Sequence, residues 1–183
     1  ILCGTTEIRT NLELLRAPRA ANPDAVLVYK PHPDVEAGLR PGAIDAAGLA
    51  DVVATGTDAI ALILACEEVW TMTSLLGFEA LLRGKPVTTL GAPFYAGWGL
   101  TRDLGNPPLR RRQAADGHPL PRVTLDHLVH AALIASPRYY DPVTRRPCPP
   151  EVALDRLADA TPPPRRLLAK AQGALAGWAH LWR

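Results

Sequence analysis

The sequence predicts an α/β fold: a Rossmann-like, doubly wound parallel sheet followed by C-terminal helices. Short runs rich in β-branched and aromatic residues alternate with segments of helical spacing, a pattern typical of parallel sheets. The run at residues 25–29 is continuously apolar, as expected of a strand covered on both faces. The predicted strands are residues 1–3, 25–29, 51–54, 68–72 and 87–90, and the predicted helices between them are residues 8–21, 58–65 and 75–82.

Length and composition place the chain among globular proteins. It has 183 residues, 48% hydrophobic and 21% charged, with a formal net charge of +2, enough for one domain or one lobe of a larger enzyme. The chain contains no basic stripe with interleaved aromatic residues, so nucleic acid is not an expected partner.

The cysteines and the apolar segments indicate a cytoplasmic protein. Cys3, Cys66 and Cys148 are far apart and form no paired spacing, so we expect neither disulfides nor a zinc site, and no metal or other cofactor. No apolar run reaches the roughly 18 residues of a membrane-spanning helix, and no signal peptide is visible. Because the chain begins at Ile1 and Met72 is its only methionine, we expect a fragment of a longer product or a processed chain.

The first candidate site follows the strand predicted at residues 25–29. In Lys30-Pro31-His32-Pro33 two prolines flank a histidine and hold the backbone extended, which aims the imidazole before any ligand arrives. His32 is then a candidate donor to a phosphate or a base carbonyl, and Lys30 a candidate point charge for the same anion. The alternatives are a structural histidine and a lysine at a solvated strand end.

The second candidate site lies in a predicted strand–helix–strand unit at residues 68–90. Thr73 and Ser74 have the chemistry of a helix N-cap, and Gly84 and Pro86 end the helix. Free backbone N–H groups at a helix start accept an anion, and a carboxylate further along, at Glu79, suits the hydroxyls of a ribose. The alternative is an ordinary capped helix with a solvent-facing glutamate.

These two segments both follow predicted parallel strands, and parallel strands open their sites at their carboxyl ends. We therefore expect both to face one ligand.

A third segment, residues 92–103, is dense in glycine and aromatic residues. Gly97 allows close backbone approach to a ligand, and Tyr95 and Trp98 offer stacking faces. Arg102 is the fourth candidate in this loop for contact with a donor or acceptor, and it is also expected to fix the loop through an ion pair with the neighbouring Asp103. The alternative is a loop pinned to the core by its aromatic side chains.

The remainder of the chain divides by composition. Residues 1–105 are predicted as a Rossmann-like lobe, residues 106–150 as a loop, helix and proline-rich extension, and residues 151–183 as a helical tail. The triplet Arg110-Arg111-Arg112 lies in a polar stretch. We interpret this stretch either as a mobile surface loop or as a groove that binds an anionic acceptor. The last predicted helix, residues 165–183, suits packing on a missing domain or lying on an anionic membrane surface.

Several of these stretches together resemble the capsule polysaccharide synthesis family, and most closely its KpsC (LipA-like) β-Kdo glycosyltransferases. The resemblance rests on Tyr29-Lys30-Pro31-His32-Pro33-Asp34-Val35 with Gly38, on residues 71–87 and 91–103, and on residues 124–126, 137–144 and 147–151. It implies the C-terminal donor-binding lobe of a GT-B module. It also implies CMP-Kdo as donor and a phosphatidylglycerol-type lipid as acceptor, at the inner face of the inner membrane.

The resemblance also implies roles for individual residues. His32 and Pro33, with Thr73 and Ser74, would hold the CMP part of the donor, and Glu79 would take the ribose by similarity to GT-B folds generally. The catalytic residues are unknown and are expected in a missing N-terminal lobe, so the chain by itself is expected to be inactive. That lobe is an expected partner, as is a capsule assembly complex.

One segment departs from the family pattern, and two other functions compete with the one that the resemblance implies. Residues 4–10 lack the family's usual glycine-glutamine opening of this lobe, which puts donor or acceptor contacts there in doubt. The competing hypotheses are a non-catalytic remnant that binds a nucleotide sugar, and another GT-B-shaped enzyme such as an epimerase, which would prefer UDP to CMP.

Overall fold

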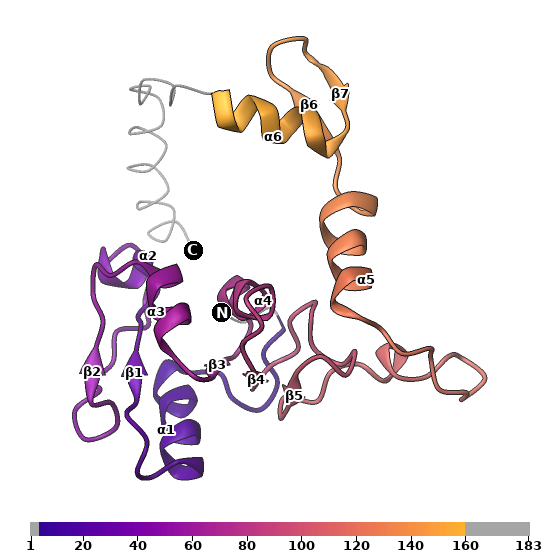
Figure 1. Cartoon of the computed structure of the whole chain (residues 1–183). Helices are drawn as coiled ribbons and strands as arrows, with labels where there is room; N and C mark the ends of the chain where they lie inside the picture. Colours follow the sequence, from indigo (N-terminus) through magenta and orange to yellow (C-terminus); the bar gives the residue numbers. More distant parts are fainter. Residues whose placement is uncertain (1–3, 160–183) are drawn as a thin grey trace, which may run out of the picture. The chain divides into compact units, whose positions relative to one another are not determined.

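The computed structural model describes residues 4–159. The chain divides into two compact units, Ile1–Leu128 and Val129–Arg183, and the parallel strands belong to the first (Figure 1). The strand predicted at residues 1–3 and the helix predicted at residues 165–183 lie outside the described residues. The three-part division at residues 105 and 150 stays a prediction.

The first unit is a mixed α/β structure with parallel strands, as the sequence predicts. Its two described sheets are β1–β2 and β3–β4–β5, with every pairing parallel. In chain order its elements are α1 (Asn11–Ala21), β1 (Val28–Tyr29), α2 (Pro33–Glu36), β2 (Val52–Val53), α3 (Ala59–Ala65), β3 (Val69–Thr71), α4 (Leu75–Leu81), β4 (Val87–Thr89), β5 (Arg102–Asp103) and the 3-10 helix η1 (Leu109–Arg111), followed by α5 (Leu125–Val129) at the boundary.

The first helix begins later than its hydrophobic spacing predicts. Thr10 is its N-cap: the Thr10 hydroxyl accepts from the Glu13 amide at 3.2 Å, and the Glu13 carboxylate accepts from the Thr10 amide at 3.0 Å. This reciprocal capping box satisfies two backbone donors and defines the helix start at Asn11.

The expectation that the run at residues 25–29 is a strand covered on both faces is wrong, because β1 contains only Val28 and Tyr29 of this run. Val26 is 77% exposed, and Val52 and Val53 on β2 are about half exposed. Tyr29 packs in a buried cluster with Leu15 of α1 and with the loop residues around Ala46, so one face of β1 is covered. Since β1 and β2 pair only with each other among the described strands, β2 has an open edge.

The strand–helix–strand unit predicted at residues 68–90 is confirmed. β3 and β4 pair in parallel with Val69 opposite Val87 and Thr71 opposite Thr89, and α4 connects them. Phe78 and Leu81 bury one side of α4, and Val87 is 2% exposed on the strand beside it. This apolar contact fixes the orientation of α4, and with it the position of Thr73 and Ser74 at the start of the helix.

The second unit is described here for residues 129–159. A π-helical segment, η2 (His130–Ala135), continues α5, so the helix predicted at residues 124–136 exists but widens in its second half. The proline-rich stretch contains an antiparallel hairpin, β6 (Tyr139–Asp141) and β7 (Arg146–Cys148), which the sequence reading missed, and α6 (Pro150–Asp159) follows. No described helix in either unit is both long and apolar enough to cross a membrane.

A buried carboxylate organises the hairpin and α6. Asp141 is 2% exposed and accepts hydrogen bonds from the Val143 amide at 2.9 Å, the Thr144 hydroxyl at 2.9 Å and the Arg156 guanidinium at 3.1 Å. These donors, Arg156 first among them, lower the pKa of Asp141 to about 2. Asp141 therefore joins the hairpin, its turn and α6 through one carboxylate.

This arrangement predicts acid-induced opening of the hairpin–helix contact. Because the folded pKa of Asp141 lies below the value of about 3.9 for an unfolded chain, its stabilising contribution is complete above about pH 4 and is lost as the pH falls toward 2. The protection factor of the Val143 amide, which is its NMR exchange rate divided into the intrinsic rate at the same pH, should fall over that window. In an Asp141→Asn variant the pH-dependent step should disappear, and a step that persists there would contradict this assignment.

Candidate functional site

The segment after β1 forms a rigid turn with a half-exposed histidine. His32 is the N-cap of α2, its Nδ1 accepts from the Asp34 amide at 3.1 Å, and Pro33 occupies the first helical position. With Nδ1 used as an acceptor, the proton of the neutral imidazole is carried by Nε2. The His32 side chain is 50% exposed, and its Nδ1 also lies 3.5 Å from the Asp34 carboxylate. That Nε2–H donates to a ligand stays a prediction.

Lys30 does not present a free charge. Its Nζ donates to the Glu36 carboxylate at 2.7 Å, and both side chains are largely covered. Glu36 also accepts from the Gly56 amide at 3.4 Å, and these contacts, with the Lys30 hydrogen bond first, lower the pKa of Glu36. Lys30 and Glu36 therefore tie the end of β1 to the loop after β2, a role that neither interpretation of Lys30 anticipated.

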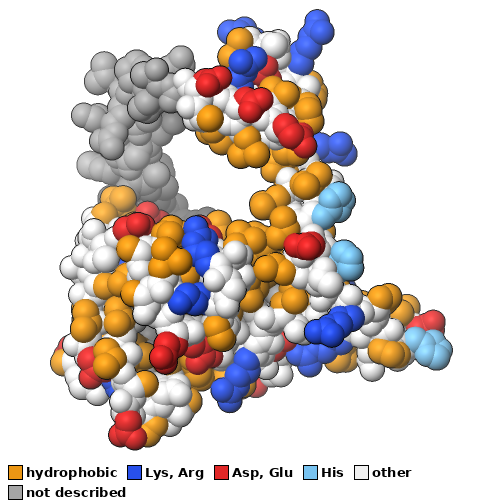
Figure 2. All heavy atoms as spheres, viewed as in Figure 1, with side chains coloured by type: hydrophobic (Ala, Val, Ile, Leu, Met, Phe, Trp, Pro, Cys, Tyr) orange, Lys and Arg blue, Asp and Glu red, His pale blue; other side chains and the backbone are white. Residues whose placement is uncertain are grey.

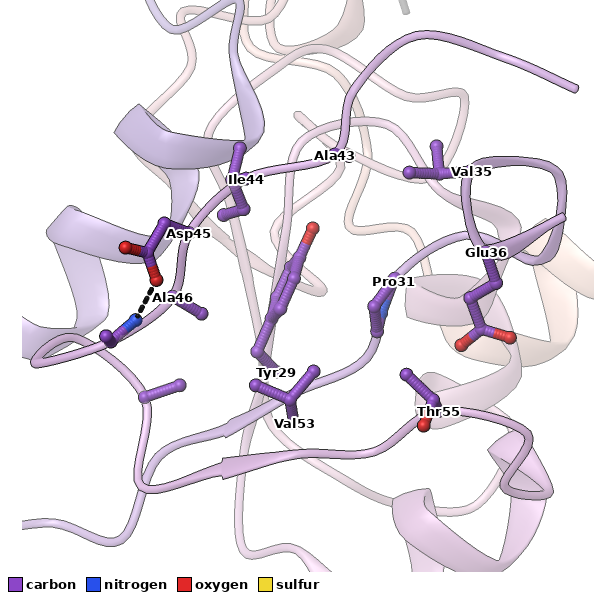
Figure 3. A pocket seen from close by; sticks show the side chains of 12 residues that line it. Tyr29, Pro31, Val35, Glu36, Ala43, Ile44, Asp45, Ala46, Val53 and Thr55 are labelled. Atoms are coloured by element: carbon purple, nitrogen blue, oxygen red, sulfur yellow. Dashed lines mark hydrogen bonds between the residues drawn. The ribbon is translucent and has the colours of Figure 1, made fainter. Parts of the chain in front are cut away.

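A cavity of about 510 Å³ lies beside this turn. In Figure 3 the Tyr29 ring stands in its centre, between Ile44 on one side and Pro31 on the other, with Glu36 and Thr55 at the polar end. Its remaining lining is mostly small and apolar. The residues after β3 do not line it, so the cavity belongs to the β1–β2 segment alone.

The second segment places hydroxyl groups at the start of α4. The Ser74 Oγ accepts from the Leu76 amide at 3.2 Å, which confirms Ser74 as the N-cap. Thr71 is 5% exposed and its hydroxyl accepts from the Ser74 amide at 3.2 Å, so it supports the turn from inside. Thr73 is half-buried and Ser74 is exposed.

Glu79 is half-buried on α4. Its backbone oxygen accepts from the Arg83 guanidinium at 2.7 Å, while its carboxylate makes no hydrogen bond or ion pair with any residue from 4 to 159. Within the same residues no hydrogen bond or ion pair joins the His32 turn to the Thr73–Ser74 turn. That both segments contact one ligand stays a prediction.

The loop after β4 is held against the start of α4 by a buried tyrosine. Tyr95 is completely buried, packs on Phe78 with ring centroids 6.3 Å apart, and donates its hydroxyl to the Ser74 carbonyl at 2.5 Å. Burial raises the pKa of Tyr95, which keeps the hydroxyl protonated as a donor. The expectation that Tyr95 offers a stacking face is wrong, because its ring is inside the core; the alternative, a loop pinned by aromatic residues, holds for this side chain.

Asp103 joins the two ends of the same loop. This carboxylate accepts from the Gly97 amide at 3.0 Å, from Thr101 at 2.6 Å and from Arg112 at 3.1 Å. Gly97 has φ +87°, and a Cβ there would lie 2.9 Å from Pro107, so no other residue fits the turn without strain.

The predicted ion pair between Arg102 and Asp103 is wrong. Successive strand residues point to opposite faces, and both residues lie on β5. The Arg102 guanidinium is 5.9 Å from the Trp70 ring centre, while Asp103 pairs with Arg112. Arg102 is therefore exposed on the opposite side of the strand from the Gly97 turn.

Arg111 clamps the loop from η1. It donates to the Pro93 carbonyl at 2.5 Å and to the Ala96 carbonyl at 2.8 Å, and lies 5.9 Å from the centre of the Trp98 ring. Burial, with a smaller contribution from Arg110, lowers the pKa of Arg111, but an arginine begins so high that it stays charged at neutral pH. Arg111 and Arg112 thus serve the fold, and the proposed acceptor groove is left with the exposed Arg110.

Trp98 remains partly accessible. Its Nε1 donates to the Phe94 carbonyl at 2.7 Å, and Phe94 is itself 42% exposed. Of the four residues predicted for this loop, Trp98 and Arg102 keep accessible surface, and their contact with a donor or acceptor stays a prediction. Gly97 is buried and its amide is bound to Asp103, so the expectation that it lets a ligand approach its backbone is wrong.

Comparison with known proteins agrees with an α/β fold whose polar loops follow parallel strands. Residues 2–139 match the family described as "Capsule polysaccharide biosynthesis protein", and the chain belongs to this family. It is 47% identical over 153 residues to the "Capsule polysaccharide modification protein LipA" of Neisseria meningitidis serogroup A, covering 82% of this chain and 20% of LipA. It is 41% identical to the "Lipopolysaccharide-processing protein LpsZ" of Rhizobium meliloti, covering 76% of this chain and 30% of LpsZ.

Solved structures give the same likeness. The KpsC β Kdo 2,7 transferase of Thermosulfurimonas dismutans matches with a TM-score of 0.71 and 39% identity, covering 85% of this chain and 47% of that one. The β Kdo 2,4 transferase of the same KpsC matches with a TM-score of 0.68 and 34% identity, covering 80% and 44%. The chain thus spans about a fifth of the LipA relative and about half of the solved chains.

Gly77 is required by the Tyr95 contact. A Cβ at this position would overlap the Tyr95 hydroxyl and lie 3.0 Å from Thr71. Alanine normally stabilises a helix relative to glycine by about 1 kcal/mol. Here the overlap with Tyr95 should outweigh that gain, so that Gly77→Ala lowers the free energy of unfolding by about 2 kcal/mol, as measured by urea titration. In a Tyr95→Phe background the substitution should cost less. A stabilised Gly77→Ala chain would contradict this packing.

The Arg111 clamp is testable against its neighbour. Arg111→Ala should lower the free energy of unfolding by about 2 kcal/mol, because two carbonyls lose a charged donor. It should also expose Phe94 and Trp98 to chymotrypsin in limited proteolysis. The matched control, Arg110→Ala, removes an exposed arginine and should change stability by less than about 0.5 kcal/mol. Equal effects of the two substitutions would refute a specific clamp.

Proposed function

We propose that the chain is the donor-binding lobe of a glycosyltransferase that transfers Kdo from CMP-Kdo to a lipid-linked acceptor during synthesis of the capsule linker. The observation that carries this proposal is the likeness to two Kdo transferase structures, at 39% and 34% identity over most of the chain. The names of the LipA relatives support a role in capsule polysaccharide assembly.

The proposed donor site consists of the two turns after β1 and β3. His32, through Nε2–H, and the hydroxyls of Thr73 and Ser74 supply neutral donors for the phosphate of CMP. Pro33 holds the histidine in place, and the free carboxylate of Glu79 takes the ribose hydroxyls. This assignment is supported by the exposure of His32 and Ser74 and by their position after parallel strands.

The proposed chemistry is sugar transfer with CMP as leaving group. Negative charge grows on the phosphate as the bond to the anomeric carbon of Kdo breaks, and fixed donors aimed at that phosphate stabilise the transition state. We assign no acid of this chain as nucleophile. Because the chain covers 47% of the β Kdo 2,7 transferase chain, we expect it to bind donor but to need the remaining lobe for turnover.

Calorimetric titration with CMP tests the proposal. The chain should bind CMP in preference to UDP and inorganic phosphate, and His32→Ala or Ser74→Ala should weaken CMP binding at least tenfold, because each removes a donor to the same anion. Preference for UDP would instead indicate another nucleotide-sugar enzyme, such as an epimerase.

Matched controls are available in the same chain. His118→Ala changes a second histidine that also precedes a proline, and Thr10→Ala removes another N-cap hydroxyl, on α1. Neither should change CMP affinity. If the controls weaken binding as much as the site variants, or if His32→Ala and Ser74→Ala leave it unchanged, the site is wrong. CMP binding without turnover by the full-length product would favour a non-catalytic remnant.

A further inference from the structure

The β6–β7 hairpin has one face covered by α6 and one that is not. Cross-strand partners share a face, and the register pairs Tyr139 with Cys148, Tyr140 with Pro147 and Asp141 with Arg146. The Asp141 face is turned toward α6, because its carboxylate binds Arg156 there. Tyr140 and Pro147 therefore lie on the outer face.

The outer face combines apolar and basic side chains. Tyr140 is 56% exposed and Val143, in the connecting turn, is 69% exposed. Arg138 precedes β6 and Arg145 lies in the turn, and both are exposed. The single acidic residue between positions 137 and 149 is Asp141, which is buried and already paired. The outer face is thus positively charged with no exposed carboxylate of its own.

The acidic residues of this unit lie on α6 instead. Glu151, Asp155 and Asp159 are exposed along that helix. In Figure 2 blue side chains project from the hairpin end of the unit, and red ones lie over α6. A charge distribution of this kind orients a protein at a surface, with the basic side attracted to fixed negative charge and the acidic side turned away.

We propose that the outer hairpin face, defined by Arg138, Tyr140, Val143, Arg145 and Pro147, docks on a lipid surface that carries anionic headgroups. Tyrosine favours the boundary between headgroups and acyl chains, since its ring is apolar and its hydroxyl is polar. The exposed valine at the turn gains by leaving water, and each arginine gains from the negative surface potential. An anionic polymer in solution would use the arginines but offer no apolar phase for Val143.

The test is co-sedimentation of the 183-residue chain with vesicles of phosphatidylcholine alone or with added phosphatidylglycerol. The wild type should bind the phosphatidylglycerol vesicles in a salt-sensitive manner and the neutral vesicles at least tenfold less. Arg138→Gln with Arg145→Asn should weaken binding roughly tenfold or more, from about 1 kcal/mol per arginine near an anionic surface. Asparagine is chosen because Arg145 has φ +57°, a conformation that asparagine tolerates.

Two further variants separate this surface from general charge effects. Arg16→Gln with Arg122→Gln removes the same charge from exposed positions of the other unit and should retain binding within about twofold. Val143→Ser keeps the charge and should also weaken binding. Unchanged binding of the hairpin variants, an equal loss in the Arg16 and Arg122 control, or no preference of the wild type for phosphatidylglycerol would each overturn the proposal. So would loss on removing the arginines without loss in Val143→Ser, which would indicate attraction by charge alone with no contribution from the apolar turn.

Discussion

The hydrogen bond from the buried Tyr95 hydroxyl to the Ser74 carbonyl is the contact on which the rest of the candidate site depends. It brings the loop after β4 against the first residue before α4, and it demands glycine at position 77, where any side chain would meet the ring. Arg111 fixes the turn that carries Tyr95 by binding the carbonyls on either side of it. The Ser74 turn is thereby held in place by a core residue, Tyr95, and needs no ligand to fix its conformation.

A second constraint is that the cations near the site are used within the protein. Lys30 is paired with Glu36, Arg112 with Asp103, and Arg111 with backbone carbonyls. Apart from Arg102, which is exposed on the opposite side of β5, the groups that the two turns leave for an anion are the imidazole N–H and the hydroxyls. Hydrogen-bond donors of this kind suit a phosphate whose negative charge increases as a bond breaks, because they hold the ground state less tightly than an unpaired cation would.

The sequence predicts the elements whose signals are local. The run before Thr73, the N-cap chemistry of Ser74 and the stop at Gly84 define the β3–α4–β4 unit, and the proline clamp identifies the His32 turn. It does not predict interactions between distant residues. The sequence predicts an exposed stacking residue at Tyr95, because no neighbouring residue in the sequence indicates that its ring packs against the distant Gly77. Glu36 and Arg111 carry no motif, since their partners are set by tertiary packing, and the hairpin at residues 139–148 is hidden by its prolines.

The central claim is that the turn after β1 and the turn after β3 contact one nucleotide. The most direct measurement is an NMR titration of the ¹⁵N-labelled chain with CMP, which maps the perturbed amides. The account predicts shifts at the two cap amides, Asp34 beside His32 and Leu76 beside Ser74, that saturate with a single dissociation constant. Shifts confined to one turn, or to the cavity around Tyr29 with Leu76 unaffected, would contradict it.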